Sequence, residues 1–145
     1  MKDLKPIIRL NQRSVDERRR HLGELQRAEE RLLADIAAFE VQVEQERAVA
    51  ATDLNLARAL PAFLTHAKQR REQFQHAQAM MRQEIAKAEE MVADAFRELK
   101  KFEQVQEQRD LAAKQARRYR ETQMFDEVAS IRFSRQHGDG SEDQT

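Results

Sequence analysis

The feature that most limits the fold of this chain is its scarcity of residues that end helices. Its 145 residues include three glycines and two prolines. A β-sheet protein needs frequent turns, which glycine, proline and short polar residues supply. The chain is instead rich in the helix formers Ala, Leu, Glu, Gln and Arg. Because 36% of the residues are charged and 40% are hydrophobic, we predict an all-α protein with a thin, seam-like core.

Two stretches of the chain carry apolar residues in steps of three and four, or of seven where one position is polar. This spacing places side chains on one stripe of a helix and is typical of coiled coils. The first stretch contains Ile8, Val15, Leu22, Leu25, Leu32, Ile36, Phe39, Val43 and Ala50. The second contains Phe63, Ala67, Phe74, Met81, Ile85, Ala88, Val92, Ala95, Leu99 and Phe102.

Pro61 is the only proline between these stretches. It lacks a backbone N–H and disfavours helical geometry at Leu60, and Thr52, Asp53 and Asn55 before it favour a turn or a cap. We therefore predict an antiparallel coiled-coil hairpin that forms one domain over residues 1–136. Helix one is expected over about 5–58, the reversal over about 52–61, helix two over about 61–136, and a disordered tail over 137–145. The alternative is one continuous helix that dimerises in parallel.

A reversal near residue 60 leaves the second helix longer than the first. Position i of the first helix would then face about position 120 − i, so that Leu22 lies near Leu99 and Ile8 lies near Ala112. Beyond Ala116 about twenty residues would have no partner, although they carry several large apolar side chains. Such a surface predicts the binding of a partner. The alternatives are a different turn position, or a second helix that folds back or self-associates.

The charges suggest where partners dock and exclude several chemistries. Formal net charge is zero, but both terminal segments are basic, and residues 58–71 include four basic and no acidic residues. These two basic patches indicate two docking regions. The alternative is that the patches are only solvated surface. The chain has no cysteine, no Gly-rich phosphate loop and no histidines at metal-ligand spacing, so we expect no catalysis, no metal and no cofactor. The basic runs at 18–20 and 116–120 are diluted by acidic residues, so nucleic-acid binding is not expected. The sequence lacks a secretory signal and any apolar run long enough for membrane insertion, which predicts a cytoplasmic protein.

Both ends of the chain resemble the FliJ family of flagellar type III export proteins. The resemblance is carried by IIRLNQRSVDERRRHLGEL at 7–25 and by QRDLAAKQARRYRETQMFDEVASIRFSRQ at 108–136. In the second segment an Arg- and Ala-rich helix passes into Asp126-Glu127-Val128-Ala129, which spaced arginines follow. The resemblance implies a cytoplasmic stalk protein, peripheral to the inner membrane at the flagellar basal body.

Family membership would also imply partners. Its members insert their terminus-bearing end into the hexameric export ATPase and activate it, contact the cytoplasmic domain of the membrane export gate, and escort export chaperones. The residues expected at the ATPase ring are Arg9, Arg13, Arg18, Arg117, Arg118, Tyr119, Met124, Phe125, Val128, Ile131 and Phe133. The residues expected at the gate are Phe63, Leu64, Ala67, Arg70 and Phe74, of which Phe63 and Phe74 are equally candidates for the hairpin core. A virulence type III secretion stalk and a generic coiled-coil scaffold or holdase are the alternative functions.

Overall fold

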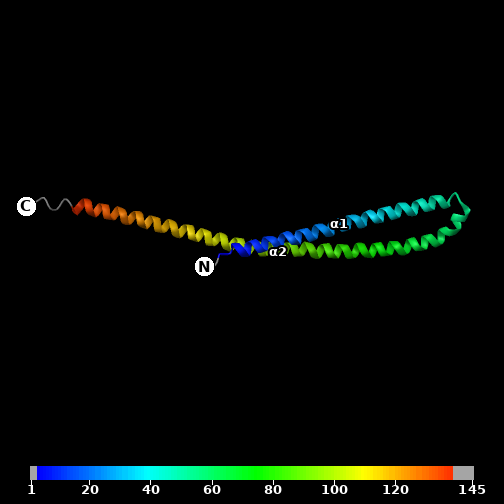
Figure 1. Ribbon diagram of the computed structural model, residues 1–145, viewed down its shortest axis with the longest axis horizontal. Helices are drawn as coiled ribbons and strands as arrows, with labels where there is room; N and C mark the ends of the chain where they lie inside the picture. Colours follow the sequence, from blue (N-terminus) through cyan, green and yellow to red (C-terminus); the bar gives the residue numbers. More distant parts are fainter. Residues whose placement is uncertain (1–2, 139–145) are drawn as a thin grey trace, which may run out of the picture. The chain divides into compact units, whose positions relative to one another are not determined.

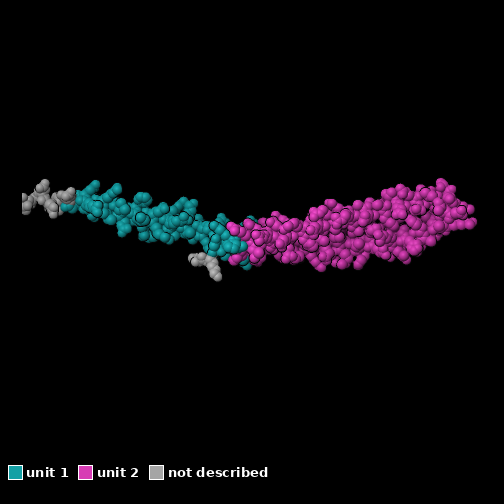
Figure 2. Space-filling view, in the orientation of Figure 1, with its two compact units in different colours: residues 1–6, 100–145 teal, residues 7–99 magenta. Residues whose placement is uncertain are grey.

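The computed structural model of the protein describes residues 3–138, which form two long α-helices and no strand (Figure 1). Helix α1 spans Lys5–Ala50 and helix α2 spans Leu54–Gly138. This confirms the all-α fold and the longer second helix. The chain divides into two compact units, one of residues 7–99 and one of residues 1–6 with 100–145 (Figure 2). The single domain over residues 1–136 stays a prediction. The tail expected from residue 137 lies outside the described residues, except for positions 137 and 138, which continue α2.

The unit of residues 7–99 is an antiparallel hairpin in which α1 and the first half of α2 lie side by side (Figure 1). Its buried side chains are Val15, Val43, Ala50, Ala67, Ala88 and Leu99. Every seam position predicted from the sequence is buried or half-buried, including those of intermediate exposure such as Leu32 and Met81. Two helices can shield only one stripe each, which explains why few side chains are fully buried and why the core is thin.

The reversal occupies three residues, Ala51–Asp53, between the two helices. The N–H of Thr52 donates to the carbonyl of Val49 at 3.1 Å, which tightens the end of α1. The carboxylate of Asp53 then accepts hydrogen bonds from the N–H groups of Asn55 at 2.8 Å and Leu56 at 3.4 Å. This is the geometry of an N-cap, which satisfies donors that have no partner within the helix. The first helix thus ends at Ala50 rather than near residue 58, and the second begins seven residues before Pro61.

Pro61 lies inside α2 instead of marking the turn. An interior proline removes one helical hydrogen bond and crowds the carbonyl four residues earlier, here that of Ala57. The helix continues through this position and curves within its first turns (Figure 1). Asp53 therefore determines where α2 begins, and Pro61 is accommodated as a local defect.

The earlier turn shifts the register of the two helices. Phe39 lies against Phe74, with ring centroids 5.5 Å apart, whereas a reversal near residue 60 would have placed it near residue 81. Arg18 contacts the sulfur of Met91 at 3.9 Å. In the other unit, the Leu4 N–H donates to Oε1 of Gln106 at 3.3 Å. The start of the first helix therefore lies beside Gln106. A reversal near residue 60 would have placed Leu4 near residue 116, ten residues further along α2.

Candidate partner-binding surfaces

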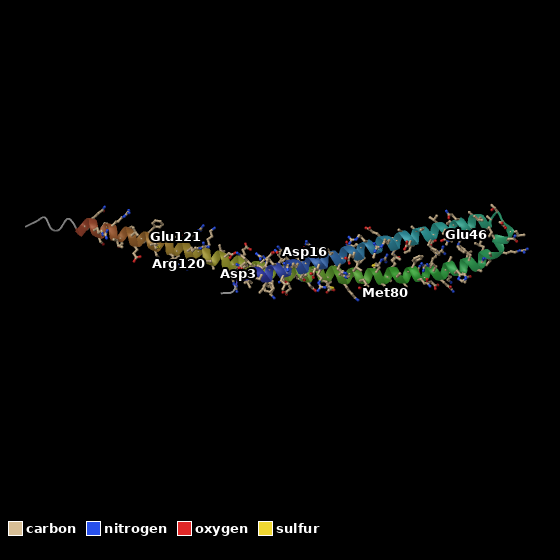
Figure 3. All side chains as sticks on the ribbon, in the orientation of Figure 1. Asp3, Asp16, Glu46, Met80, Arg120 and Glu121 are labelled. Carbon is tan, nitrogen blue, oxygen red and sulfur yellow. The ribbon has the colours of Figure 1, made fainter. Side chains whose placement is uncertain are left out.

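The C-terminal part of α2 over residues 107–138, which we call the overhang, is an exposed helix, and Asp3 and Lys5 near the start of the chain line an open groove with its first part, residues 109–113. All 32 of these residues are exposed. Local bonds support the helix: the Thr122 hydroxyl donates to the Arg118 carbonyl at 2.9 Å, and the Gln123 amide donates to the Tyr119 hydroxyl at 2.9 Å. Arg120 and Glu121 lie on this stretch (Figure 3). The overhang is longer than the segment expected beyond Ala116.

Large apolar side chains of the overhang are exposed to solvent. The six predicted from the sequence are 47–75% exposed. They are Tyr119, Met124, Phe125, Val128, Ile131 and Phe133. Leu111, which is 56% exposed, belongs with them and was missed because it was counted within the paired part of the helix. Exposed apolar residues at this density indicate a binding surface.

The apolar side chains of the overhang occupy more than one face of the helix. Met124, Val128 and Ile131 follow one another at steps of four and three, so they share a face. Met124, Phe125 and Val128 line an open apolar groove together with Glu121. Tyr119 is fourteen residues from Phe133, about four turns, so this pair lies on a second face. The Phe133 ring stacks on His137 with centroids 4.0 Å apart.

The basic residues expected at the same surface fall into two groups. Arg117 and Arg118 lie in the overhang and are exposed. Arg9, Arg13 and Arg18 are also exposed but belong to α1 in the hairpin unit. Each group is available to a partner within its own unit.

The candidate residues near the tip of the hairpin are mostly committed to its core. Ala67 is 3% exposed, and the Phe74 ring packs against Phe39 of α1. Phe63 and Leu64 are half-buried. Arg70 is exposed, and its guanidinium lies 4.5 Å from the centroid of the Phe74 ring, a cation–π arrangement. Of the five residues, Arg70 therefore presents the most accessible side chain to a partner.

A charged pair across the hairpin seam was not foreseen from the sequence. Arg71 donates through Nε and Nη2 to the two oxygens of Glu40, at 2.7 and 2.8 Å. The hydrogen bond from Arg71 lowers the pKa of the Glu40 carboxyl from its ordinary value. Such a two-pronged contact favours the relative position of the helices at which these two side chains meet. Only the opposite charges on two seam-flanking positions could have indicated it, and the expected register placed these residues apart.

Among residues 3–138, no helix is long and apolar enough to cross a membrane. In the same range, no three His, Asp or Glu side chains gather in a way that could hold a metal ion. A family model described as "Flagellar FliJ protein" matches residues 1–138. No curated protein and no solved structure is similar enough to match the chain.

Proposed function

The chain belongs to the FliJ family of flagellar proteins, and from this membership we propose that it is the stalk of the flagellar type III export apparatus. Membership already makes it an export-related flagellar protein. We propose further that it has no catalytic activity of its own and acts by binding and activating the hexameric export ATPase. Because the matching family model is flagellar, a flagellar role is favoured over a virulence secretion stalk.

The observation that carries the proposal is the overhang, a helix of 32 exposed residues with large apolar side chains on more than one face. A partner that docks on one side of a helix needs an apolar stripe on that side alone. Apolar residues on several faces are better suited to a partner that surrounds the helix, as the central hole of a hexameric ring does. Seven basic and five acidic residues at 107–138 add a modest positive charge to this shaft.

The same proposal includes the two other partners that the family implies. The tip of the hairpin would contact the cytoplasmic domain of the membrane export gate, with Arg70 as its most accessible candidate. Export chaperones would bind transiently and be escorted to the apparatus. The protein would work in the cytoplasm at the base of the flagellum.

The test is ATP turnover by the cognate export ATPase with the full chain and with a version ending at Gln106, which lacks the overhang. We expect stimulation by the full chain and its loss on truncation at Gln106. A version ending at Gly138 is the control, because it removes only residues beyond the overhang and should stimulate fully. Equal stimulation by the Gln106 version would assign activation to the hairpin instead. Absence of stimulation by the full chain, together with absence of co-sedimentation with the ring, would refute the stalk function.

A point variant sharpens the same experiment. Phe125 is 75% exposed, so its replacement by Ala should leave folding unchanged. If the ring covers this side chain, the loss of an aromatic anchor should weaken binding by about 2 kcal/mol, roughly thirtyfold. Val41→Ala is the matched control, since Val41 is an exposed apolar residue of α1 that belongs to neither predicted contact set.

A further inference from the structure

The overhang carries one face with the pattern of a coiled-coil seam. Steps of four and three connect Arg117, Glu121, Met124, Val128, Ile131 and Arg135. All six side chains are exposed. The centre of this face is apolar, and charged residues stand toward both of its ends, so its contacts would be governed by charge order as much as by burial.

The order of these charges selects a second copy of the same chain as the occupant of this face. Acidic Asp110 is followed by four basic residues between 114 and 120, by acidic Glu121, Asp126 and Glu127, and by basic Arg132 and Arg135. We propose that two copies pair through their overhangs as antiparallel helices, with a two-fold axis between Thr122 and Gln123. Reversal of one copy places Arg135 opposite Asp110 of the other, and Arg120 beside Glu127 of the other. The two-fold axis repeats each pairing, which gives four opposite-charge contacts.

The antiparallel direction follows from the same sequence. A parallel pair would place each seam residue next to its own copy, so that Arg117, Glu121 and Arg135 would each meet a like charge, which is destabilising. In the antiparallel register, Val128 lies opposite Arg117 of the other copy, whose aliphatic stem covers the apolar side chain while its charge stays in water. In the same register, Arg118 of one copy would lie near the Phe125 ring of the other copy, where a cation–π contact is favourable.

This inference goes beyond the proposed function because it concerns the chain alone. Paired overhangs would cover Met124, Val128 and Ile131 until a partner takes their place. The interface is small and charged, so the association should be weak, concentration-dependent and weakened by salt. A chain that does not self-associate could still activate the ATPase. A chain that does not activate the ATPase could still self-associate.

The test is sedimentation equilibrium of the full chain and of charge variants. Arg120→Glu places like charges beside each other twice in the pair, and should weaken dimerisation about tenfold. Glu127→Arg should do the same, and the double variant R120E/E127R should recover the affinity to within about threefold, because the pairing is restored with its signs exchanged. Arg19→Glu, an exposed arginine of α1, changes the net charge equally and should have no effect. A full chain that stays monomeric at every accessible concentration, or a double variant that stays as weak as the single ones, would overturn the proposal.

A distance measurement settles the direction of the pair. The chain has no cysteine, so Glu107→Cys offers one site for a spin label. In the antiparallel register residue 107 lies opposite residue 138 of the other copy, so the two labels should be about 45 Å apart at 1.5 Å per residue. Neighbouring helices lie about 10 Å apart, so a parallel pair would bring the labels close together. A short label-to-label distance would refute the antiparallel arrangement.

Discussion

The most direct test of the hairpin core is the replacement of Val43, whose side chain is 0% exposed, by alanine. The change removes two buried carbon atoms, each worth about 0.8 kcal/mol, so the loss of burial costs about 1.6 kcal/mol. A residual cavity between the helices adds up to about 1 kcal/mol. Alanine is a better helix former than valine by about 0.5 kcal/mol, which offsets part of the loss. We expect a net decrease of about 1–2 kcal/mol in the free energy of unfolding.

Val41 provides the control, because it lies two residues away on the same helix and is 57% exposed. Val41→Ala removes the same atoms and gains the same helix propensity, but loses little burial, so its stability should be nearly unchanged. Urea unfolding followed by circular dichroism at 222 nm gives both values by linear extrapolation. The two variants should differ by about 1–2 kcal/mol. A difference below about 0.5 kcal/mol would contradict the assignment of Val43 to the core, since only burial distinguishes the two sites.

Two further predictions concern the turn and the charged pair. Pro61→Ala should stabilise the hairpin by about 1–3 kcal/mol in the same urea assay, because the Ala57 carbonyl regains its helical donor; unchanged or reduced stability would indicate that Pro61 acts as a turn residue. Because the folded-state pKa of Glu40 is lowered, its charge contributes stability above its ordinary pKa of 4.5, and this contribution disappears as the pH falls through the lowered value. The wild-type chain should therefore have a higher melting temperature than Glu40→Gln at pH 7, and the difference should disappear in acid. A difference in melting temperature that does not depend on pH would exclude a contribution from the Glu40 charge.

The seam of the hairpin was predictable because it depends only on spacing. Apolar residues at steps of three and four, such as Ile85, Ala88 and Val92, lie on one side of a helix whatever the rest of the chain does. The unbroken pattern from Met81 to Phe102 therefore predicted which face would be covered, and each of its positions is buried or half-buried. The seven-residue step from Val43 to Ala50 passes over the polar residue Glu46, which is exposed in the structure.

The position of the turn was not predictable from the seam, because a seven-residue pattern is unchanged when one helix slides by seven residues. Phe39 packs on Phe74 instead of lying near Met81, and Leu4 bonds to Gln106 instead of lying near Ala116; these shifts of seven and ten residues both keep the seam on one stripe. Local signals had to choose the register, and two of them competed. Pro61 disfavours helical geometry before it, whereas the carboxylate of Asp53 satisfies two N–H groups at the helix start, and the cap prevails. A proline inside a helix costs stability but does not forbid the helix.

The candidate surfaces differ in how well the sequence indicated them. Residues such as Phe125 and Ile131 were found because they continue an apolar helix beyond its partner, and they are exposed as expected. The exposure of Leu111 was not predicted, because a reversal near residue 60 places this residue in the paired part of the second helix. Near the tip, Ala67 and Phe74 were candidates for a contact surface, but the structure places them in the core. One sequence cannot distinguish a core position from a docking position when both require apolar residues at the same spacing.

The exposure of residues 107–138 has a consequence for the kinetics of amide exchange. A helix held only by its own hydrogen bonds opens by fraying from its end, and short segments of it unfold without disturbing the rest of the molecule. Amide protons of Met124 or Val128 should therefore exchange far faster than those near Val43 or Leu99, which exchange only when the two helices separate. Any partner that encloses the overhang must suppress this fraying, so the slowing of exchange, residue by residue, would map how much of the helix the partner holds.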